Sequence, residues 1–425
     1  MLEGRRIALG VCASVAAYKA ADLVSKLQQA GALVDVILTE HAGEFVRPLT
    51  FATVGHRAVY TDLWEPTGEA AARHIELGQA AEALVIAPAT ANTIAQLAHG
   101  IANDLLTTVA LVTSAPLVIA PAMEGQMYTH PATQANLRLL AERGAIIIPP
   151  EVGHLASGEI GVGRFPETAT LLAYIRRALG RAGDLAGRRV VVTAGGTREP
   201  IDPVRYVGNH SSGLMGFALA EEARDRGAEV TLIIGAASAA IPQGMNEIIQ
   251  VGSALEMRDA VLQAVVGADA LVMAAAVADY RVEHPADHKI KKGSREENAD
   301  GTLTIHLIPN PDILKEVASS PGAQGLIRVG FAAETHDLNA NATGKLHKKK
   351  LNMLVANDVT KQGSGFGVET NEVAIYHADG RIEQLALLPK TAVAAAIWDR
   401  VAPLLRARDA GQEETRTPAT HREGK

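Results

Sequence analysis

The sequence has 425 residues and 48% apolar side chains, enough for two or three domains with cores of their own. Its net charge of −7 argues against non-specific binding to nucleic acids, and its lone cysteine, Cys12, excludes a disulfide framework or a multi-cysteine metal site. No apolar stretch reaches the roughly 20 residues of a membrane-spanning helix, and no signal peptide is evident, so we expect a soluble cytoplasmic protein.

The first half of the sequence alternates predicted strands and helices. Apolar residues from Ala17 to Leu27 recur with helical spacing. Short apolar runs predict buried strands at Ile7–Val11, Leu33–Thr39, Leu84–Ala87, Leu117–Ala120 and Ile146–Ile148. This alternation predicts a parallel sheet with helices on both faces, whose ligands bind beyond the carboxyl ends of the strands.

Polar side chains follow several of these strands. Ser14 lies where the first helix begins, so its hydroxyl could meet a phosphate or, more commonly, cap the helix. Thr39 ends the second strand. Pro88–Thr93 follow the next strand, and their small side chains would let a flat ring lie close or would only form a tight turn with an N-cap.

Three further features allow both a functional and a structural interpretation. His74 precedes Ile-Glu-Leu in a helix-like segment, where a lone histidine is more often a surface or capping residue than a catalyst. Glu124 follows Pro-Ala-Met after a strand and could belong to an ordinary turn. Residues 153–164 contain glycines at positions 153, 158, 161 and 163, which fits a mobile loop over a site or, equally, an inert surface loop.

Together these motifs resemble the flavin-dependent cysteine decarboxylases. The shared pattern is a Gly-rich turn before Ala16–Lys19, a histidine before Ile-Glu-Leu, Ala-Pro-Ala-Thr-Ala-Asn, Pro-Ala-Met and a flap that ends in Gly-x-Gly-Arg. The resemblance implies a flavodoxin-like domain in which FMN oxidises the substrate thiol to a thioaldehyde, CO2 leaves and a hydride returns. It implies catalytic roles for His74, Glu124 and Ser157, and FMN contacts for Gly10, Ser14, Thr39, Pro88, Thr90 and Asn92.

Two residues depart from that family pattern. Glu124 stands where the best-known members have asparagine, and Ser157 stands where they have a flap cysteine that acts as the acid. A serine hydroxyl is a far weaker acid than a thiol, whose pKa is about 8.5. Ser157 could orient a water, and His74, Glu159 or a flavin-bound water could supply the proton instead. Cys12 aligns with the first turn, where we expect a packed small residue.

The second half of the sequence predicts another parallel α/β domain. Its expected strands are Val190–Thr193, Val230–Gly235, Ala270–Ala275, Ile327–Ala332 and Met353–Ala356, followed by a hairpin of Glu372–Tyr376 and Arg381–Leu387. We therefore expect two Rossmann-like domains, at 1–180 and 188–408, joined by a Gly-rich linker at 181–187. Residues 409–425 lack apolar periodicity, which predicts a disordered tail.

Residues 193–216 form the most informative stretch, because they make a long connection from a strand to a helix. An ordinary βα loop has about 2–6 residues. Gly195 and Gly196 would let a ligand approach the backbone, and the free amides that begin the following helix favour phosphate. The glycines do not follow the strand as Gly-x-Gly-x-x-Gly, which disfavours a dinucleotide site.

Other candidates in this half have a structural alternative. Asp279 ends an apolar strand but could be an N-cap, and Asn310–Ile313 read as a cap and turn. Phe331 is a core residue by default, although it lies at a strand end where a base could stack. The basic runs at Lys289–Lys292 and Lys345–Lys350 could be solvated surfaces.

In order, these pieces resemble the phosphopantothenate–cysteine ligases, and the chain to about residue 400 resembles the bifunctional ligase/decarboxylase family of coenzyme A biosynthesis. That resemblance implies that phosphopantothenate reacts with CTP to an acyl-cytidylate held by Asn209, and that cysteine then displaces CMP. It implies a catalytic role for Lys289 as well, and Mg2+ on Asp279 and the phosphates. The implied CTP contacts are Gly195, Gly196, Ser211, Ser212, Gly213, Ala274, Ala275, Ala276, Asp279, Lys289, Asn310, Pro311, Asp312, Ile313, Phe331, Lys345 and Lys349. Leu214 stands where many members have lysine.

Two alternatives stay open on the sequence alone. The flavin half could be only a binding or oligomerisation module, in which case the yellow protein would release no CO2. A nicotinamide oxidoreductase lacks its glycine fingerprint here, and NADH binding would revive it. The family resemblance also implies flavin-domain trimers and ligase-domain dimers, which together would build a dodecamer.

Overall fold

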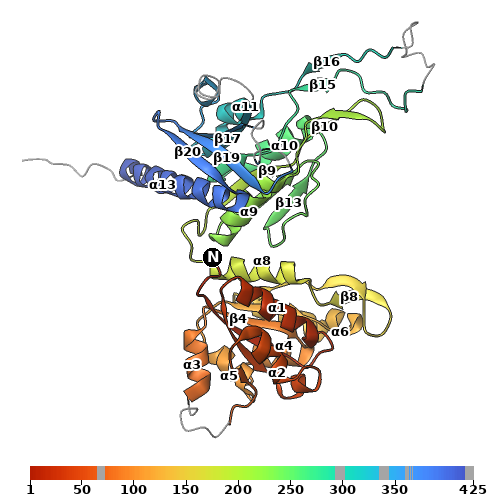
Figure 1. Ribbon diagram of the computed structural model, residues 1–425, viewed down its shortest axis with the longest axis vertical. Coiled ribbons are helices and arrows are strands. Elements are labelled where there is room, and N and C mark those ends of the chain that lie inside the picture. The colour runs from red at the N-terminus through yellow and green to blue at the C-terminus, as the bar shows by residue number, and fades with distance from the viewer. Residues whose placement is uncertain are drawn as a thin grey trace, which may run out of the picture. The chain divides into compact units, whose positions relative to one another are not determined.

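A computed structural model of the chain describes residues 1–64, 72–291, 302–334, 344–358, 363, 365 and 367–416. The chain divides into two compact units, Met1–Arg181 and Ala182–Lys425, and each is described by itself (Figure 1). In the part of the chain just given, no helix combines the length and the apolar character that crossing a membrane requires.

The first unit is built on a parallel six-stranded sheet in the order β3-β2-β1-β4-β5-β6. Its strands are β1 (Arg6–Val11), β2 (Leu33–Leu38), β3 (Val59–Tyr60), β4 (Ala83–Ala89), β5 (Leu117–Pro121) and β6 (Ile146–Ile147). Its helices are α1 (Ala17–Gln29), η1 (Glu40–Glu44), α2 (Pro48–Gly55), α3 (Arg73–Ala80), α4 (Ala91–His99), α5 (Leu105–Val112), α6 (Gly125–Thr129), α7 (Pro131–Glu142) and α8 (Thr168–Leu179). The expected α/β fold class is confirmed.

Helices cover both faces of this sheet because its strands are apolar on both sides. Ile7, Leu9 and Val11 of β1 are fully buried in a core that also contains side chains of α1 and α8. Ala8, which points to the other face, is buried with side chains of α4, α5 and α7. The continuous apolar runs of the sequence are therefore strands that pack against helices on each side.

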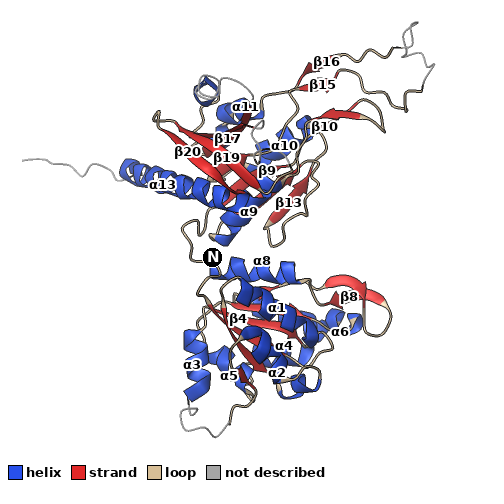
Figure 2. Cartoon of the chain, viewed as in Figure 1, coloured by secondary structure: helices blue, strands red, loops and turns tan. Residues whose placement is uncertain are grey.

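The second unit has a mixed eight-stranded sheet in the order β13-β12-β9-β14-β17-β18-β19-β20, parallel up to β18 and antiparallel beyond it. Its strands are drawn in red in Figure 2. Its strands are β9 (Arg189–Ala194), β12 (Glu229–Ile234), β13 (Glu247–Gln250), β14 (Ala270–Met273), β17 (Ile327–Glu334), β18 (Met353–Asp358), β19 (Thr370–His377) and β20 (Ile382–Pro389). Its helices are α9 (Leu214–Asp225), α10 (Ala254–Ala264), α11 (Ile313–Ser319), η3 (Pro321–Ala323) and α13 (Lys390–Arg416). The expected hairpin at the end of the sheet is present as β19 and β20.

Three short antiparallel ribbons complete the two units. One is a hairpin of β7 (Glu151–His154) and β8 (Ile160–Arg164) in the first unit. The other two belong to the second unit and pair β10 (Arg198–Pro200) with β11 (Tyr206–Gly208) and β15 (Tyr280–Val282) with β16 (Leu307–Pro309). The glycine-rich segment that we expected to be a loop is thus a hairpin over much of its length.

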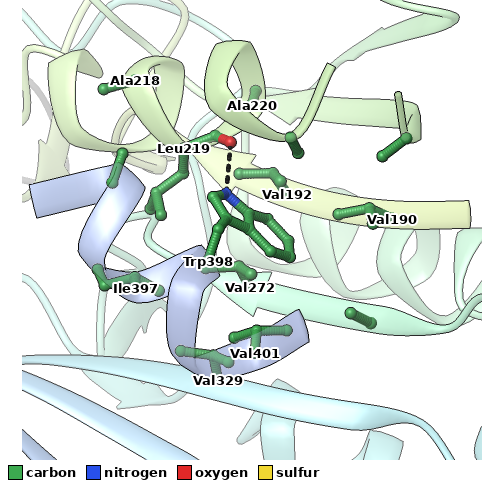
Figure 3. Close-up of a cluster of buried hydrophobic side chains, with 14 of the residues drawn as sticks. Val190, Val192, Ala218, Leu219, Ala220, Val272, Val329, Ile397, Trp398 and Val401 are labelled. Carbon is green, nitrogen blue, oxygen red and sulfur yellow. Dashed lines mark hydrogen bonds between the residues drawn. The ribbon is translucent and has the colours of Figure 1, made fainter. Parts of the chain in front are cut away.

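Trp398 anchors α13 in the core of the second unit (Figure 3). Its side chain has no exposed surface and packs with Val192 of β9 and Val272 of β14. The indole Nε1 donates a hydrogen bond to the backbone oxygen of Leu219 in α9 over 2.9 Å. A buried indole N–H usually has a hydrogen-bond partner, and here that partner belongs to α9. The hydrogen bond therefore links α13 to α9.

Both sheets reverse their strand order at equivalent places. In the first unit the reversal lies between β1 and β4, and in the second unit between β9 and β14. Loops that leave two adjacent strands at such a point run in opposite directions and open a crevice beyond their carboxyl ends. The topology therefore gives each unit one preferred place for a ligand.

The C-terminal end of the second unit differs from expectation. We expected disorder from residue 409, but α13 continues to Arg416. Arg408 donates to Asp269 over 2.6 Å, and Asp409 pairs with Arg188, so two ion pairs hold the helix where apolar periodicity has ended. Residues 417–425 lie outside the described part. Within the expected linker, Leu185 is fully buried in the core of the second unit.

Candidate active sites

The second unit contains a cleft of about 790 Å³ at the carboxyl edge of its sheet. Three loop segments line most of it: residues 208–216 before and within α9, residues 273–279 after β14, and residues 310–314 at the start of α11. Because these loops follow strands on both sides of the β9/β14 reversal, the cleft lies where the topology favours a ligand.

Buried polar residues hold these loops in place. Thr197 is fully buried, and its hydroxyl accepts a hydrogen bond from the amide of Ala278 over 2.9 Å. Glu199, which is 1% exposed, accepts from the amide of Ala254 at the start of α10 over 3.0 Å. These side chains satisfy backbone amides that would otherwise be buried without partners. Part of the segment 193–216 therefore supports the site without lining it.

Asp202 is the most heavily bonded of these groups. Its carboxylate accepts from the Arg205 guanidinium, from the amides of Val204 and Arg205, and from the amide of Ile290 over 3.2 Å. The Arg205 guanidinium, followed by the amides, holds the pKa of Asp202 well below its usual range. Arg205 also donates to the oxygen of Ile290, so the residue after Lys289 is tied to the loop.

The N-terminus of α9 opens into the cleft. Its N-cap is Gly213, whose φ of +84° suits glycine and which offers no side chain to cap the helix. Gly216 lies in the first turn, where a Cβ would come within 2.6 Å of the Ala194 side chain. The absence of that Cβ lets α9 pack directly on the end of β9, which brings the first amides of the helix to the cleft.

Two asparagines and a carboxylate organise the segment after β14. Asn209 donates to the oxygen of Val277 over 3.1 Å, and Asn310 donates to the oxygen of Ala278 over 2.9 Å. The Asp279 backbone oxygen accepts from the amide of Asn310, which leaves the exposed Asp279 side chain at the cleft. Side-chain amides thus fix the backbone that lines the site.

Most of the predicted nucleotide residues come together in this cleft. The predicted residues that line it are Asn209, Ser211, Ser212, Gly213, Ala274, Ala275, Ala276, Asp279, Asn310, Pro311, Asp312, Ile313, Phe331, Lys345 and Lys349. Three predicted residues do not line it. Gly195 and Gly196 pack against the backbones of Ala236 and Ala276, and Lys289 is exposed elsewhere on the unit. The two glycines serve the close approach of loops in this structure.

The sequence interpretation missed residues that approach the cleft from the far strands of the sheet. Asn357 is the next-to-last residue of β18, Asn371 is the second residue of β19, and Lys390 follows β20. Because β19 and β20 are antiparallel, the end of β20 lies at the same edge as the end of β18. The predicted hairpin was the signal in the sequence that could have found Lys390, because the second strand of the hairpin ends at this edge. Of the predicted lysines, Lys349 pairs with Asp312 over 3.1 Å.

The candidate site of the first unit is organised around the β1/β4 reversal. The amide of Cys12 donates to the oxygen of Pro88, whose peptide bond with Ala87 is cis, over 3.2 Å. Thr90 is the N-cap of α4 and accepts from the amide of Thr93. The N-cap of α1 is Ala16, with no side-chain cap, and the Ser14 hydroxyl accepts from its amide over 3.2 Å. The turn after β1 and the end of β4 are thus joined.

The remaining FMN candidates differ in their surroundings. A Cβ on Gly10 would come within 2.4 Å of the Leu106 side chain, so this glycine serves helix packing in the structure. Thr39 is the half-buried N-cap of η1, and Asn92 is exposed on α4. The Cys12 thiol is fully buried, and burial raises its pKa to about 11. It is packed as expected.

The three catalytic candidates of the first unit lie on separate elements. His74 is half-buried on α3, Glu124 is the N-cap of α6, and Ser157 is exposed in the turn between β7 and β8. Glu124 accepts from the amide of Gly125 over 3.1 Å. No hydrogen bond in the described ranges joins these three side chains. The hairpin is nevertheless anchored beside Glu124, because the amide of Met123 donates to the oxygen of Gly163 over 3.1 Å.

Within the residues that the structure describes, neither unit has a preformed metal centre. In the described part of the chain, no three His, Cys, Asp or Glu side chains are grouped so that they could hold a metal ion. The carboxylates of Asp279 and Asp312 both line the cleft, and Asp312 is paired with Lys349.

Comparisons with known proteins match both halves of the chain. Residues 1–180 match the family model described as Flavoprotein, and residues 185–405 match that of the DNA/pantothenate metabolism flavoprotein C-terminal domain. The chain is 45% identical over 406 residues to the coenzyme A biosynthesis bifunctional protein CoaBC of Bacillus subtilis, covering 95% of this chain and 98% of the relative. It is 43% identical over 379 residues to the Escherichia coli K12 protein of the same name, covering 89% and 92%.

Solved structures also match each half. The crystal structure of a CoaBC C-terminal domain is 37% identical, with a TM-score of 0.44, and the match covers 53% of this chain and 99% of that one. The FMN-binding protein AtHal3 is 32% identical, with a TM-score of 0.37, and the match covers 41% of this chain and 96% of that one.

Proposed function

Because the chain belongs to the CoaBC family of bifunctional coenzyme A biosynthesis enzymes, which are phosphopantothenoylcysteine synthetases and decarboxylases, we propose how its two units divide the work. The cleft of the second unit joins phosphopantothenate to cysteine at the expense of CTP. The strand ends of the first unit bind FMN and decarboxylate the product. The observation that carries the first assignment is the convergence of the α9 N-terminus, two asparagines and several lysines on one cleft.

The cleft fits a nucleoside triphosphate in size and charge. Its volume of about 790 Å³ lies within the usual range for small-molecule sites. The uncapped start of α9 favours phosphate oxygens, and Lys345 and Lys349 add positive charge from another element. Phe331 lies at the cleft, where its ring offers a surface for the base.

The proposed ligation has two displacement steps. The carboxylate of phosphopantothenate attacks the α-phosphorus of CTP, the bond to the β-phosphate breaks, and pyrophosphate leaves. The amine of cysteine then attacks the acyl carbon, CMP leaves with the bonding electrons, and the nitrogen loses a proton. Asn209, held to the oxygen of Val277, would orient the acyl-cytidylate between these steps, and Lys289 would approach from its exposed segment.

Mg2+ fits this cleft only as a partner of the phosphates. Asp279 supplies one exposed carboxylate there, and magnesium commonly binds through one or two carboxylates with phosphate oxygens and water. We therefore place Asp279 as its protein ligand, with the remaining ligands supplied by substrate and water.

The first unit fits FMN at the β1/β4 reversal. The uncapped start of α1, with Ser14 beside it, would hold the phosphate, and the cis Ala87–Pro88 segment with Thr90 would lie against the ring. Bound flavin would supply the two-electron acceptor that the decarboxylation needs. Glu124 is positioned by the Gly125 amide, and the β7–β8 hairpin carries Ser157, so these two residues would orient the carboxylated substrate and its proton source.

Association of several chains is also part of the proposal. Flavin-unit trimers and ligase-unit dimers, combined as a dodecamer, follow from the family resemblance. Exposed apolar side chains on the first unit, among them Tyr18, Leu49 and Ile160, support such contacts. A cytoplasmic location likewise stays a prediction.

The test is product analysis by mass spectrometry after incubation with phosphopantothenate, cysteine, CTP and Mg2+. We expect CMP, CO2 and phosphopantetheine from the unmodified protein. Asn209→Asp should lower CMP release at least tenfold, because it replaces the amide donor with a carboxylate, whereas the exposed Asn103→Asp should not change it. Absence of CMP would contradict the ligase assignment.

A second candidate function is ligation without decarboxylation, with the flavin unit kept for binding. The exposed Ser157 and the capping role of Glu124 favour it. Accumulation of phosphopantothenoylcysteine without CO2 would support this alternative, and Ser157→Ala would then leave the products unchanged. Release of CO2 by the unmodified protein would exclude it.

A further inference from the structure

Lys390 is a buried cation at the cleft that the proposed function does not use. It begins α13 directly after β20, and the pairing of Thr370 with Pro389 brings it to the edge where β18 ends and β19 begins. The side chain lines the cleft, yet the residue is only 5% exposed. It differs in this from the predicted lysine Lys349, which is partly exposed and paired with Asp312.

The local environment disfavours a positive charge at this position. The ammonium is buried, and it lies at the N-terminus of a helix, where the dipole favours anions. It donates to the backbone oxygens of Gly365 over 3.1 Å and Val368 over 2.5 Å, but no carboxylate in the described residues forms an ion pair with it. Burial lowers the pKa of Lys390, and the negative charge of Glu369 opposes this effect. An anionic ligand would relieve all of these costs.

The geometry of the ammonium limits which anion it can take. A lysine ammonium has three N–H donors, and two of them are used on Gly365 and Val368. The remaining donor suits one carboxylate oxygen better than a triphosphate, for which Lys345, Lys349 and the start of α9 are already at hand. Of the proposed substrates, cysteine carries a carboxylate that does not react.

Space for a small side chain lies beside the ammonium. A second cavity of about 330 Å³ shares Leu214 and Lys390 with the cleft. Its wall includes the apolar residues Phe217, Ala218 and Ala239, and the acidic residues Glu221 and Glu369. The –CH2–SH side chain of cysteine is short and weakly polar, so it fits the apolar part of this recess, next to a cation that holds the carboxylate.

We propose that Lys390 binds the carboxylate of the cysteine substrate and thereby selects an α-amino acid over a simple amine in the second step of ligation. This inference rests on the proposed ligase function of the same cleft. Lys390 would be a specificity-determining residue for the amine, with no part in forming the acyl-cytidylate.

The test separates the two steps of the reaction. Exchange of labelled pyrophosphate into CTP, with phosphopantothenate but without cysteine, reports the first step alone. CMP release with either cysteine or cysteamine, which lacks the carboxylate, reports the second step. The variant is Lys390→Met, which keeps the length of the side chain, and the matched control is Lys315→Met on the exposed face of α11.

We expect Lys390→Met to lower kcat/KM for cysteine at least tenfold, mainly through KM, because a charge-assisted hydrogen bond is lost. The same variant should change kcat/KM for cysteamine and the exchange rate less than twofold. Lys315→Met should change none of the three. Should Lys390→Met fail to fold, Lys390→Gln keeps a donor for the backbone oxygens and should show the same selective loss.

Three results would overturn the proposal. An equal loss with cysteine and cysteamine would show that Lys390 only supports the wall of the cleft. A loss of pyrophosphate exchange would assign it to the nucleotide. An unchanged kcat/KM for cysteine would show that it does not meet the substrate. Absence of exchange in the unmodified protein is a different failure, since it would contradict the acyl-cytidylate itself.

Discussion

The two units share a strand order but build different sites on it. In the first unit, the turn after β1 is short and closes against β4 through the Cys12–Pro88 hydrogen bond. In the second unit, residues 195–213 separate β9 from α9, and an open cleft lies beyond the strands. The common topology places both sites at the order reversal, while loop length and charge decide what each site can hold.

The two units also stabilise their sites in different ways. The turn of the first unit rests on apolar packing, with Cys12 fully buried and Gly10 against Leu106. The long loop of the second unit relies on buried polar groups, above all Thr197 and Asp202, which bond backbone amides. The second site is therefore more dependent on hydrogen bonds and charge than the first.

The largest expected effect separates the stabilities of the two units. Trp398→Ala removes a fully buried indole from the core between α9 and α13, which should cost about 3–5 kcal/mol of unfolding free energy. Because α9 also begins the cleft, CMP release should be lost while CO2 release from added phosphopantothenoylcysteine continues. Thermal unfolding followed with both activity assays would measure this.

The matched control is Trp398→Phe. It keeps an aromatic ring in the core but removes the bond to the Leu219 oxygen, so it should cost about 1 kcal/mol from the hydrogen bond together with a packing term. Simultaneous loss of both activities in Trp398→Ala would contradict the view that the units are stable separately.

A pair of glycine substitutions should affect one site each. On Gly216 a Cβ would meet the Ala194 side chain at 2.6 Å, and on Gly163 it would meet the Met123 backbone oxygen at 2.1 Å. Overpacking typically costs about 1–3 kcal/mol, so Gly216→Ala should reduce ligation and Gly163→Ala should reduce decarboxylation, each roughly tenfold or more. Steady-state rates of both reactions on both variants would measure the selectivity.

The controls are Gly380→Ala in the second unit and Gly100→Ala in the first. Both glycines have positive φ, at +89° and +67°, but a Cβ there would meet nothing within 4 Å. These two substitutions therefore measure the effect of backbone strain alone, without a steric clash at either site. If these controls impaired the reactions as strongly as Gly216→Ala and Gly163→Ala, close packing at the sites would not be the cause.

Apolar runs with helical segments between them predicted both sheets except for the edge strands β3 and β13. The resemblance to the ligase family predicted most of the residues that line the cleft, among them Asn209 and Asp279. It could not separate the supporting residues from the lining ones in the long loop. Thr197 and Glu199 look as polar as Ser211 in the sequence, and only the fold shows that they are buried.

Contacts between distant segments account for what was missed. In the sequence, Lys390 is a polar residue at the start of a helix. Only the antiparallel pairing of β19 with β20 brings it to the cleft. The helical continuation past residue 408 depends on ion pairs of Arg408 and Asp409 with Asp269 and Arg188. Such pairings join residues that are far apart in the chain, and the local periodicity of apolar residues cannot predict them.

The smallest expected effect tests whether Thr90 is a structural cap or a flavin contact. Its hydroxyl accepts from the Thr93 amide at the start of α4, so Thr90→Ala should cost about 1 kcal/mol in the unfolding of the first unit. Ser253, the N-cap of α10 in the second unit, bonds the Glu256 amide in the same way and provides the matched control. Flavin titration and thermal unfolding of both variants separate the roles.

If Thr90 also contacts FMN, Thr90→Ala should weaken flavin binding severalfold at a temperature where the apoprotein stays folded, whereas Ser253→Ala should leave it unchanged. Equal flavin affinity in both variants would show that Thr90 acts only as the cap of α4 and does not contact the flavin.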